Sequence, residues 1–477
     1  QPSIGFHHGT TGQERAQRPE QDQGTEYAQE NEARWTDDDR HEAFGHHVVE
    51  PVYEIGREEG EMCRGAAIQR HRPKVNGAAN REKAPRYLRR PREKAFAPMK
   101  FGTKAIHAGV APDPSTGAIM TPIFQTSTYV QAAPGDHKGY EYSRTHNPTR
   151  TALQNALAAL ENGTHGLCFS SGMASIDAIV KLLKPGDEVV STNDLYGGTY
   201  RLFTKIYEGF GVKFHFVDMG DLKNVEAAIT SKTKLIWAET PTNPLLRIID
   251  IAGLAAISKK CGALLGVDNT FASPYLQTPL DLGADIVMHS VTKYLGGHSD
   301  VVMGALVVKD AALAERLAFV QNSSGATPGP QDCFLVLRGL KTLHLRMQRH
   351  CENGKAVAEW LVKQPKVDKV HWPGFATHAN HAVAAKQMRG FGGMISFTLK
   401  GDRMDDATKV LSSCKLFALA ESLGGVESLL GHPASMTHAS IPREERLKNG
   451  LADTLIRLSV GLEDAEDLIA DLEQALR

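Results

Sequence analysis

Beyond residue 98, short apolar runs alternate with segments whose apolar residues recur at helical spacing. That spacing predicts helices over 151–161 and 175–183, the second ending at the Lys-Pro-Gly-Asp turn signal of 184–187. The apolar runs predict strands at 188–191, 212–217, 234–239, 264–268, 284–289 and 304–308. Strands that alternate with helices indicate βαβ units and a mostly parallel sheet.

A second α/β region is predicted toward the carboxyl end. A long helical stretch over 332–361 leads into it, with strands at 393–399 and 456–459 and a last helix over 464–476. We therefore expect an α/β fold with a large sheet domain and a smaller C-terminal α/β domain. A Gly-x-Gly-x-x-Gly sequence is absent, so a dinucleotide-binding dehydrogenase has no fingerprint here.

Residues 1–98 have a different character. They hold 33 charged residues and only 11 Leu, Ile, Val or Phe, too few apolar side chains to offset the entropy of ordering a chain. We expect this segment to be a disordered or non-native extension with no role in the chemistry. A chain that begins at Met99 is expected to keep full activity and thermal stability.

The whole chain of 477 residues has a net charge of -1, which argues against nucleic acid or an anionic membrane as partner. No run approaches the roughly 18 apolar residues of a membrane-spanning helix. The six cysteines form no C-x-x-C pair, which excludes a disulfide scaffold or a zinc ribbon, and no metal site is predicted. We expect a cytoplasmic location.

Polar residues end three of the predicted strands: Glu239, Asp268 and the pair His289-Ser290. Ligands bind at the carboxyl ends of strands in such sheets, so these residues indicate a site. Lys293 follows the third strand, and desolvation there would suit its amine to Schiff-base chemistry, although a lone lysine is more often a surface residue. Asp268 has the chemistry to keep a pyridine nitrogen protonated, although a lone aspartate is more often a turn or cap residue.

Two further segments allow two interpretations each. The run Ser-Ser-Gly-Met-Ala-Ser of 170–175 opens a predicted helix, where free backbone N–H groups bind an anion or a serine caps the helix. The run Asp-Leu-Tyr-Gly-Gly-Thr of 194–199 offers a ring that stacks on a flat cofactor or packs within a loop.

Together these residues resemble the Cys/Met-metabolism enzymes that use pyridoxal phosphate (PLP). The resemblance covers essentially all of 99–477 and none of 1–98. It rests on seven motifs in the family order, namely YSRxxNPTR at 142–150, SSGMAS, DLYGGT, ETPTNP, VDNTF, SVTKYLGGHSD and ESLGGVESL…PASMTHASI. It implies the aspartate-aminotransferase-like fold, also called fold type I.

The resemblance also implies which residues hold the cofactor. Lys293 would bind PLP covalently and shuttle protons, Asp268 would pair with the pyridinium nitrogen, and Tyr196 would stack on the ring and accept a proton from the substrate amine. The remaining cofactor contacts implied are Gly172, Met173, Ser290 and Thr292 to the phosphate, Asn243 to the 3-oxygen, and Tyr142 and Arg144 to the phosphate of a neighbouring subunit.

Substrate binding is implied for four residues. Arg457 would hold the α-carboxylate with its bidentate fork, and Ser422 would orient that carboxylate or Lys293. Glu141 and Glu421 would face the distal amino group of cystathionine or of incoming cysteine, the alternative being solvated surface carboxylates. The implied domains are an arm at 99–150 that reaches a neighbouring site, a PLP-binding domain at 151–345 and a substrate domain at 346–477.

The implied reaction is γ-carbon chemistry on transsulfuration substrates. Methionine γ-lyases tend to carry cysteine where Gly198 stands and β-lyases tryptophan where Leu423 stands, and both features are absent. We expect the γ-synthase reaction, which joins activated homoserine and cysteine into cystathionine. The alternatives are the γ-lyase reaction, which yields cysteine, 2-oxobutyrate and ammonia, and a catalytically silent binding protein. A homotetramer built from shared-site dimers is implied.

Overall fold

The computed structural model describes residues 99–439 and 442–477. The expectations for residues 1–98 therefore lie outside the described residues. Within the described ranges, no helix combines the length and the apolar character needed to cross a membrane.

A seven-stranded sheet forms the centre of the first region, in the order β1-β7-β6-β5-β4-β2-β3. β7 runs antiparallel to both of its neighbours, while the other neighbouring pairs are parallel, so the prediction of a mostly parallel sheet is confirmed. The strands are β1 (His165–Phe169), β2 (Glu188–Thr192), β3 (Lys213–Val217), β4 (Thr233–Glu239), β5 (Leu264–Asp268), β6 (Ile286–Ser290) and β7 (Gly304–Val308).

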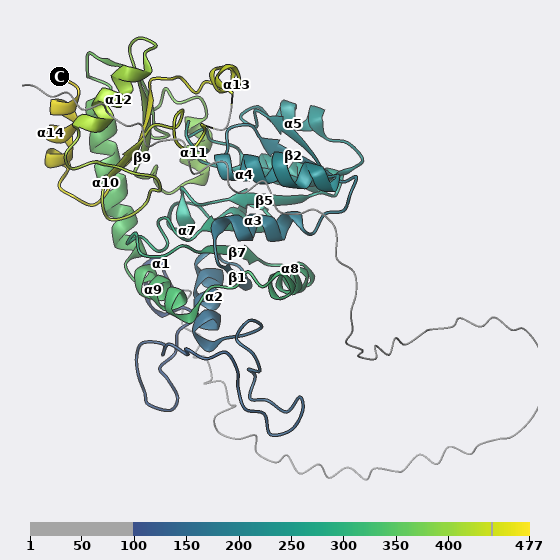
Figure 1. The fold of residues 1–477 in the computed structure, drawn as a ribbon. Helices are drawn as coiled ribbons and strands as arrows, with labels where there is room; N and C mark the ends of the chain where they lie inside the picture. The colour runs from purple at the N-terminus through teal and green to yellow at the C-terminus, as the bar shows by residue number, and fades with distance from the viewer. Residues whose placement is uncertain (1–98, 440–441) are drawn as a thin grey trace, which may run out of the picture. The chain divides into compact units, whose positions relative to one another are not determined.

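Helices cover both faces of this sheet (Figure 1). Alternate residues of a strand point to opposite faces, and β7 shows the consequence: Ala305 and Val307 join one core cluster, Leu306 and Val308 the other. α2 (Pro148–Leu160) and α9 (Pro330–Leu340) pack in the first cluster, α3 (Gly172–Val180) and α8 (Ala311–Ser324) in the second. The other helical segments of this region are α1 (Phe101–His107), α4 (Gly197–Arg201), η2 (Leu202–Ile206), η3 (Tyr207–Phe210), α5 (Leu222–Ala228), α6 (Ile251–Cys261), α7 (Ser273–Leu276) and η4 (Pro279–Leu282).

A five-stranded sheet follows toward the carboxyl end, in the order β10-β11-β12-β9-β8. α10 (Leu343–Leu361) joins the two regions, since Met347 packs in the core of the first and Val357 in the core of the second (Figure 1). The strands are β8 (Val367–His371), β9 (Met394–Leu399), β10 (Ala418–Leu419), β11 (Leu429–Gly431) and β12 (Leu455–Ser459), and the helices are α11 (His381–Gln387), α12 (Met404–Ser413), α13 (Arg443–Lys448) and α14 (Ala465–Ala475).

The structure differs most from the sequence prediction at three helices. α2 begins at Pro148, three residues before the predicted start, because Asn147 caps it by accepting the Thr149 N–H at 3.0 Å. The stretch predicted over 332–361 is two helices, because the Gly339 carbonyl, which would bond Leu343 in a continuous helix, accepts hydrogen bonds from Thr342 and from the Arg346 guanidinium. α3 begins at Gly172, three residues before the predicted start, because Ser171 caps it by accepting the Ala174 N–H at 3.1 Å.

Gly304 fixes how α3 sits on the sheet, and it provides a test of this packing. A Cβ there would overlap the Ser171 carbonyl and the Ser175 hydroxyl, so the start of α3 would have to move. We expect Gly304→Ala to lower the free energy of unfolding by about 2 kcal/mol. Gly209→Ala is the control, because a Cβ at this exposed position meets nothing within 4 Å. Urea unfolding of both variants makes the comparison, and equal stabilities would contradict this packing.

Candidate active site

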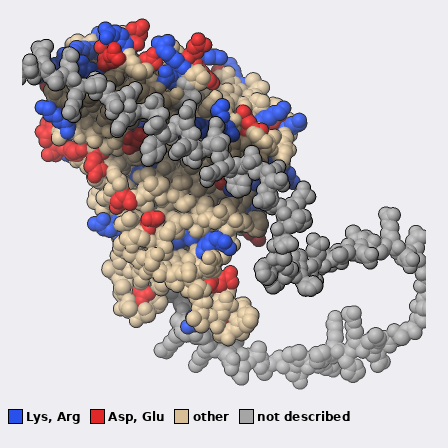
Figure 2. Space-filling view, in the orientation of Figure 1, with Lys and Arg blue, Asp and Glu red and all other residues tan. Residues whose placement is uncertain are grey.

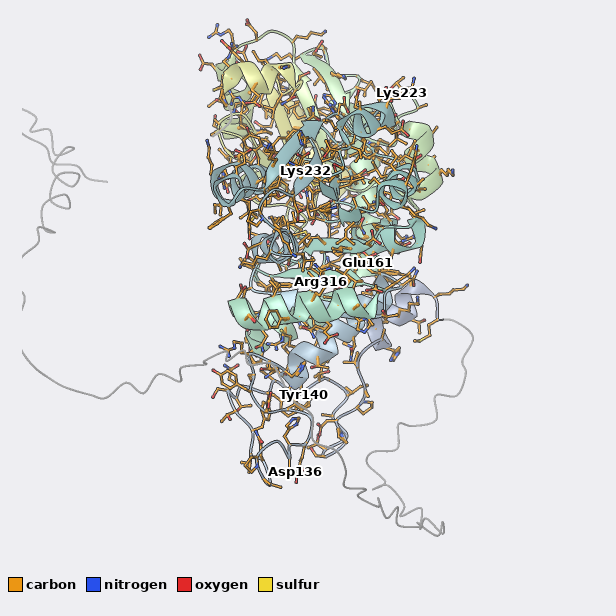
Figure 3. All side chains as sticks on the ribbon, turned by 90° about the vertical axis from the view of Figure 1, so that its right-hand side faces the viewer. Asp136, Tyr140, Glu161, Lys223, Lys232 and Arg316 are labelled. Carbon is orange, nitrogen blue, oxygen red and sulfur yellow. The ribbon has the colours of Figure 1, made fainter. Side chains whose placement is uncertain are left out.

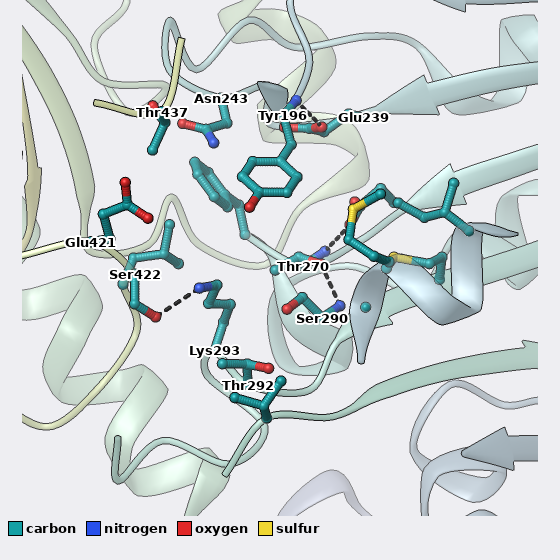
Figure 4. Close-up of a pocket in the computed structure, with 18 of the residues that line it drawn as sticks. Tyr196, Glu239, Asn243, Thr270, Ser290, Thr292, Lys293, Glu421, Ser422 and Thr437 are labelled. Atoms are coloured by element: carbon teal, nitrogen blue, oxygen red, sulfur yellow. Dashed lines mark hydrogen bonds between the residues drawn. The ribbon is translucent and has the colours of Figure 1, made fainter. Parts of the chain in front are cut away.

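A cavity of about 350 Å3 lies at the carboxyl ends of β4, β5 and β6. Residues 421–423 and Arg457 of β12 also line it, and Figure 4 shows Glu421 and Ser422 on the side of Lys293. Eleven residues predicted from the sequence line it: Gly172, Met173, Tyr196, Asn243, Asp268, Ser290, Thr292, Lys293, Glu421, Ser422 and Arg457. The structure thus brings together residues that lie up to 285 positions apart, from Gly172 to Arg457.

Lys293 projects into this cavity from the turn after β6. Its Nζ donates a hydrogen bond to Ser422 Oγ at 2.7 Å (Figure 4). Ser422 is held in the left-handed region at φ 87°, a conformation that a non-glycine residue adopts only where its surroundings enforce it. Burial, and next the positive charge of Arg457, lower the pKa of Lys293 from 10.5 to about 8. A larger share of neutral, nucleophilic amine is therefore present near neutral pH.

The lowered pKa predicts a stability cost in the cofactor-free protein. The unfolded chain binds the Lys293 proton more tightly than the folded chain between pH 8 and 10.5, so this group makes stability rise with pH in that window. At pH 7 we expect the free energy of unfolding of Lys293→Met to be about 1–3 kcal/mol larger than that of the parent. This difference should shrink toward pH 10. Urea unfolding at both pH values measures it, and a difference that does not change with pH would refute the assignment.

Asp268 ends β5 and is almost fully buried, at 6% exposed. Its Oδ1 accepts the backbone N–H of Thr270 at 3.0 Å. Burial raises the pKa of Asp268, while the hydrogen bonds of Thr270 lower it. A buried carboxylate with few donors binds a positively charged ring nitrogen strongly, because water does not compete for it.

The other end of the cavity can hold an anion. The hydrogen bonds of the described residues leave the backbone N–H groups of Gly172 and Met173 free at the start of the nine-residue helix α3. A Cβ at Gly172 would lie 3.1 Å from Ser290 Cβ, so glycine allows the helix start to approach β6. Ser290 N–H donates to Thr270 Oγ1 at 2.8 Å, and Thr292 Oγ1 contacts the Met303 backbone.

Tyr196 and Asn243 face the middle of the cavity. The Tyr196 backbone N–H donates to Glu239 Oε2 at 2.9 Å, and its phenol ring points into the cavity (Figure 4). Asn243 Oδ1 accepts from Arg457 Nη1 at 2.9 Å. This bond orients the Asn243 amide and leaves its Nδ2 as the group that can donate to an oxygen of a bound molecule.

Arg457 is a buried cation, 5% exposed, on the central part of β12. It donates to Asn243 Oδ1 and, at 3.0 Å, to the Ser422 carbonyl, and it forms no salt bridge within residues 99–439 and 442–477. Burial lowers its pKa to about 10. A buried guanidinium without an acidic partner is suited to the carboxylate of a ligand.

Three predicted site residues lie outside the cavity of their own chain. Glu141, Tyr142 and Arg144 are exposed and belong to an extended segment before α2. Figure 3 shows the end of this segment, marked by Asp136 and Tyr140, directed away from the two sheets. Buried Arg150 anchors it by donating to the carbonyls of Ser143, Arg144 and Thr145. Their contribution to a neighbouring subunit stays a prediction.

The face around this segment is poor in charge. In Figure 2 acidic and basic side chains mix over the upper part, whereas few cover the lower part around α9 and the segment. Ile119 and Val130 of the segment are 84% and 94% exposed. Exposed apolar side chains in a charge-poor area are typical of protein–protein contact surfaces.

The sequence did not assign a site role to several residues that line the cavity. They are Ile176, Glu239, Thr270, Phe271, Met288, Val302, Leu423 and Thr437. The sequence placed Glu239 at the site because it ends a predicted strand, but assigned it no role there. Thr437 carried no local signal, since it lies in a loop between β11 and α13 that only the folded chain brings to the cavity.

The chain is similar to known proteins over most of its length. The family model described as Cys/Met metabolism PLP-dependent enzyme matches residues 102–477. A protein of Coxiella burnetii named cystathionine beta-lyase is 56% identical, covering 78% of this chain and 97% of its own. One of Mycobacterium bovis named cystathionine gamma-synthase is 54% identical, covering 78% and 96%. The structure of cystathionine gamma-lyase from Lactobacillus plantarum complexed with L-serine matches with a TM-score of 0.78 at 48% identity, covering 79% of this chain and 98% of that one.

Proposed function

The chain belongs to the family of Cys/Met metabolism PLP-dependent enzymes, and we propose that it is a cystathionine γ-synthase. Such an enzyme replaces the acyloxy group on the γ-carbon of an activated homoserine by the sulfur of cysteine, and the acyloxy group leaves as a carboxylate. The family establishes PLP as the cofactor, a transsulfuration enzyme as the class of protein, and fold type I as the fold. The substrates are amino acids.

The cavity has the groups that PLP requires. We propose that the Lys293 amine binds its aldehyde carbon and that Asp268 faces its ring nitrogen. The free N–H groups at the start of α3, with Ser290 and Thr292, would take the phosphate. Gly172 supports this placement, since a side chain there would fill the space against Ser290. When bound, PLP supplies an electron sink for the charge that develops on the substrate.

Different side chains then act on different groups of the substrate. Arg457 binds the α-carboxylate and sets the orientation of the amino acid. Once the substrate amine has taken its place on the cofactor, the freed Lys293 amine removes the Cα proton, and the Ser422 hydroxyl, 2.7 Å from Lys293 Nζ, holds the amine in position. Tyr196 accepts a proton from the incoming amine at its phenol oxygen.

One observation supports a substrate with a second ammonium group. The carboxylate of Glu421 lines the same cavity as Arg457 and forms no salt bridge within the described ranges. Its charge acts on both Lys293 and Arg457. A cationic and an anionic group in one cavity match the carboxylate of one amino acid and the ammonium of another, as in cystathionine or in homoserine plus cysteine.

Cystathionine γ-lyase is the second candidate, because the same charges would hold cystathionine for cleavage and a gamma-lyase shares the fold at 48% identity. Leu423 and Gly198 support γ-carbon chemistry, although one relative bears the name cystathionine beta-lyase. The subunit assembly, the domain limits at 151 and 346 and the cytoplasmic location stay predictions.

Two assays on one preparation test the proposal. One supplies O-succinyl- or O-acetylhomoserine with cysteine and measures cystathionine, and the other supplies cystathionine alone and measures 2-oxobutyrate. We expect the larger kcat/KM for synthesis. Cleavage faster by more than about tenfold, about 1.4 kcal/mol of transition-state discrimination, would reject the synthase assignment.

Glu421→Gln tests the role given to its carboxylate in the same assays. We expect the KM for cysteine to rise about fivefold and that for the activated homoserine to stay unchanged, because only cysteine brings the second ammonium. Glu427→Gln is the matched control, since this exposed carboxylate bonds Ser299 outside the cavity. An equal KM change for both substrates would contradict the role.

A further inference from the structure

We infer that Glu239 is a positioning residue that works as a neutral carboxylic acid. Its Oε2 fixes the backbone of Tyr196. Because Glu239 carries no charge, Asp268 is the only anion of these two neighbouring carboxyl groups. This inference rests on the PLP cofactor of the family and is independent of which transsulfuration reaction the enzyme performs.

The register of the sheet places the two carboxyl groups side by side. Glu239 ends β4, Asp268 ends β5, and the two are direct partners in the parallel pairing of these strands. Neighbouring strands lie about 4.8 Å apart, and partnered residues point to the same face. Glu239 is 4% exposed and Asp268 6%, and both line the cavity.

Two carboxylates so close in a buried site do not both ionise, and the hydrogen bonds decide which one keeps the proton. Asp268 accepts the Thr270 N–H and is further stabilised as an anion by the Thr270 side chain. Glu239 accepts the Tyr196 N–H and is also stabilised as an anion by the Asn243 backbone, but no side-chain donor among the described residues acts on it, whereas the Thr270 side chain and the charge of His289 both favour the anion of Asp268. Burial and next the charge of Asp268 raise the pKa of Glu239 well above its usual value.

The remaining charged groups near Glu239 do not reverse this assignment. Asp194, which follows β2, is a further buried carboxyl that also raises the pKa of Glu239. Arg457 of β12 is the cation that interacts with Glu239. Glu239 raises the pKa of Arg457 less than Tyr196 and Glu421 do, so this interaction is weak. The proton therefore resides on Glu239.

The backbone of Tyr196 depends on this contact. Tyr196 directly precedes the short helix α4 and makes no side-chain capping bond to it, and the Tyr196 N–H donates to Glu239, 43 positions away in the chain (Figure 4). Its ring lies against Gly198, where any Cβ would overlap it. A displaced backbone at Tyr196 would therefore move the ring away from the face of the cofactor.

Two substitutions separate the neutral-acid role from an anionic one. Glu239→Gln keeps the shape and the acceptor oxygen and carries no charge at any pH. We expect its dissociation constant for PLP to stay within about threefold of the parent, and the visible circular dichroism of bound PLP to be unchanged at pH 7. Glu239→Leu leaves the Tyr196 N–H without an acceptor, and we expect its dissociation constant to rise about tenfold and the dichroism to weaken.

Infrared difference spectra between the parent and Glu239→Gln observe the proton directly. We expect the C=O stretch of a protonated carboxylic acid at pH 7 in the PLP-loaded parent and its loss in the variant. Asp285→Asn is the matched control, because this carboxyl accepts one backbone N–H, from Leu265 at 2.7 Å, at the opposite end of β5. Absence of the band, or PLP binding by Glu239→Gln weakened as much as by Glu239→Leu, would overturn the inference.

Discussion

Replacing Lys293 by alanine is expected to lower kcat/KM by about four orders of magnitude. The variant loses both the nucleophile that holds the cofactor and the base that takes the Cα proton, and base catalysis alone contributes about 10²–10⁴-fold. The site favours both roles of the Lys293 amine, because burial and Arg457 lower its pKa to about 8 and the Ser422 hydroxyl orients it. Steady-state kinetics of the PLP-loaded variant measure the loss.

Lys309→Ala is the control for this experiment. Lys309 also follows a strand of the same sheet, but it is half-exposed and bonds Asp281 and the Leu280 carbonyl at the strand end away from the cavity. We expect kcat/KM to change less than about twofold there. Activity of Lys293→Ala within tenfold of the parent would contradict the role of Lys293.

Replacing Arg457 by methionine is expected to lower kcat/KM by about 10³-fold, mostly through KM. The substrate carboxylate would be buried without its cation, a loss of about 2–5 kcal/mol. Arg457→Lys keeps the charge but loses the fork that bonds both Asn243 and Ser422, and we expect about a 10–100-fold loss. Kinetics over a range of amino-acid concentrations separate KM from kcat.

Arg346→Lys provides the comparison that removes a purely structural explanation. Arg346 is also buried, and burial also lowers its pKa to about 10, but it donates to the carbonyls of Tyr294 and Gly339 outside the cavity. We expect a lower Tm with an unchanged KM for Arg346→Lys. A KM that rises equally in both lysine variants would show that Arg457 acts through the fold alone.

The sequence predicted the parts of the site that depend on strand ends. Asp268 and Lys293 follow apolar runs that the structure confirms as β5 and β6, and parallel strands bring such ends to one edge.

The helix after Ser171 was predicted three residues late, because its first turn is stabilised by a cap and by close packing on Gly304 and carries little apolar periodicity. β1 and β8 were missed, because five-residue strands with exposed or glycine positions lack a clear alternation.

Contacts between segments that are distant in the chain could not be predicted from the local sequence pattern. The bond between Lys293 and Ser422 spans 129 positions, and that between Arg457 and Asn243 spans 214. The break between α9 and α10 depends on an arginine that reaches back to the Gly339 carbonyl. The roles of Ser422 and Arg457 therefore came from the family resemblance, and the contacts of Glu239 and Thr437 required the folded chain.

Attachment of the cofactor tests the central claim most directly. Borohydride reduction of the PLP-loaded enzyme, followed by proteolysis and mass spectrometry of the peptides, identifies the lysine that carries the cofactor. We predict that the reduced cofactor is found on Lys293, in the peptide that also contains Ser290 and Thr292 unless cleavage separates them. Label on another lysine, or enzyme that remains unlabelled after loading with PLP, would contradict the account of this cavity as the active site.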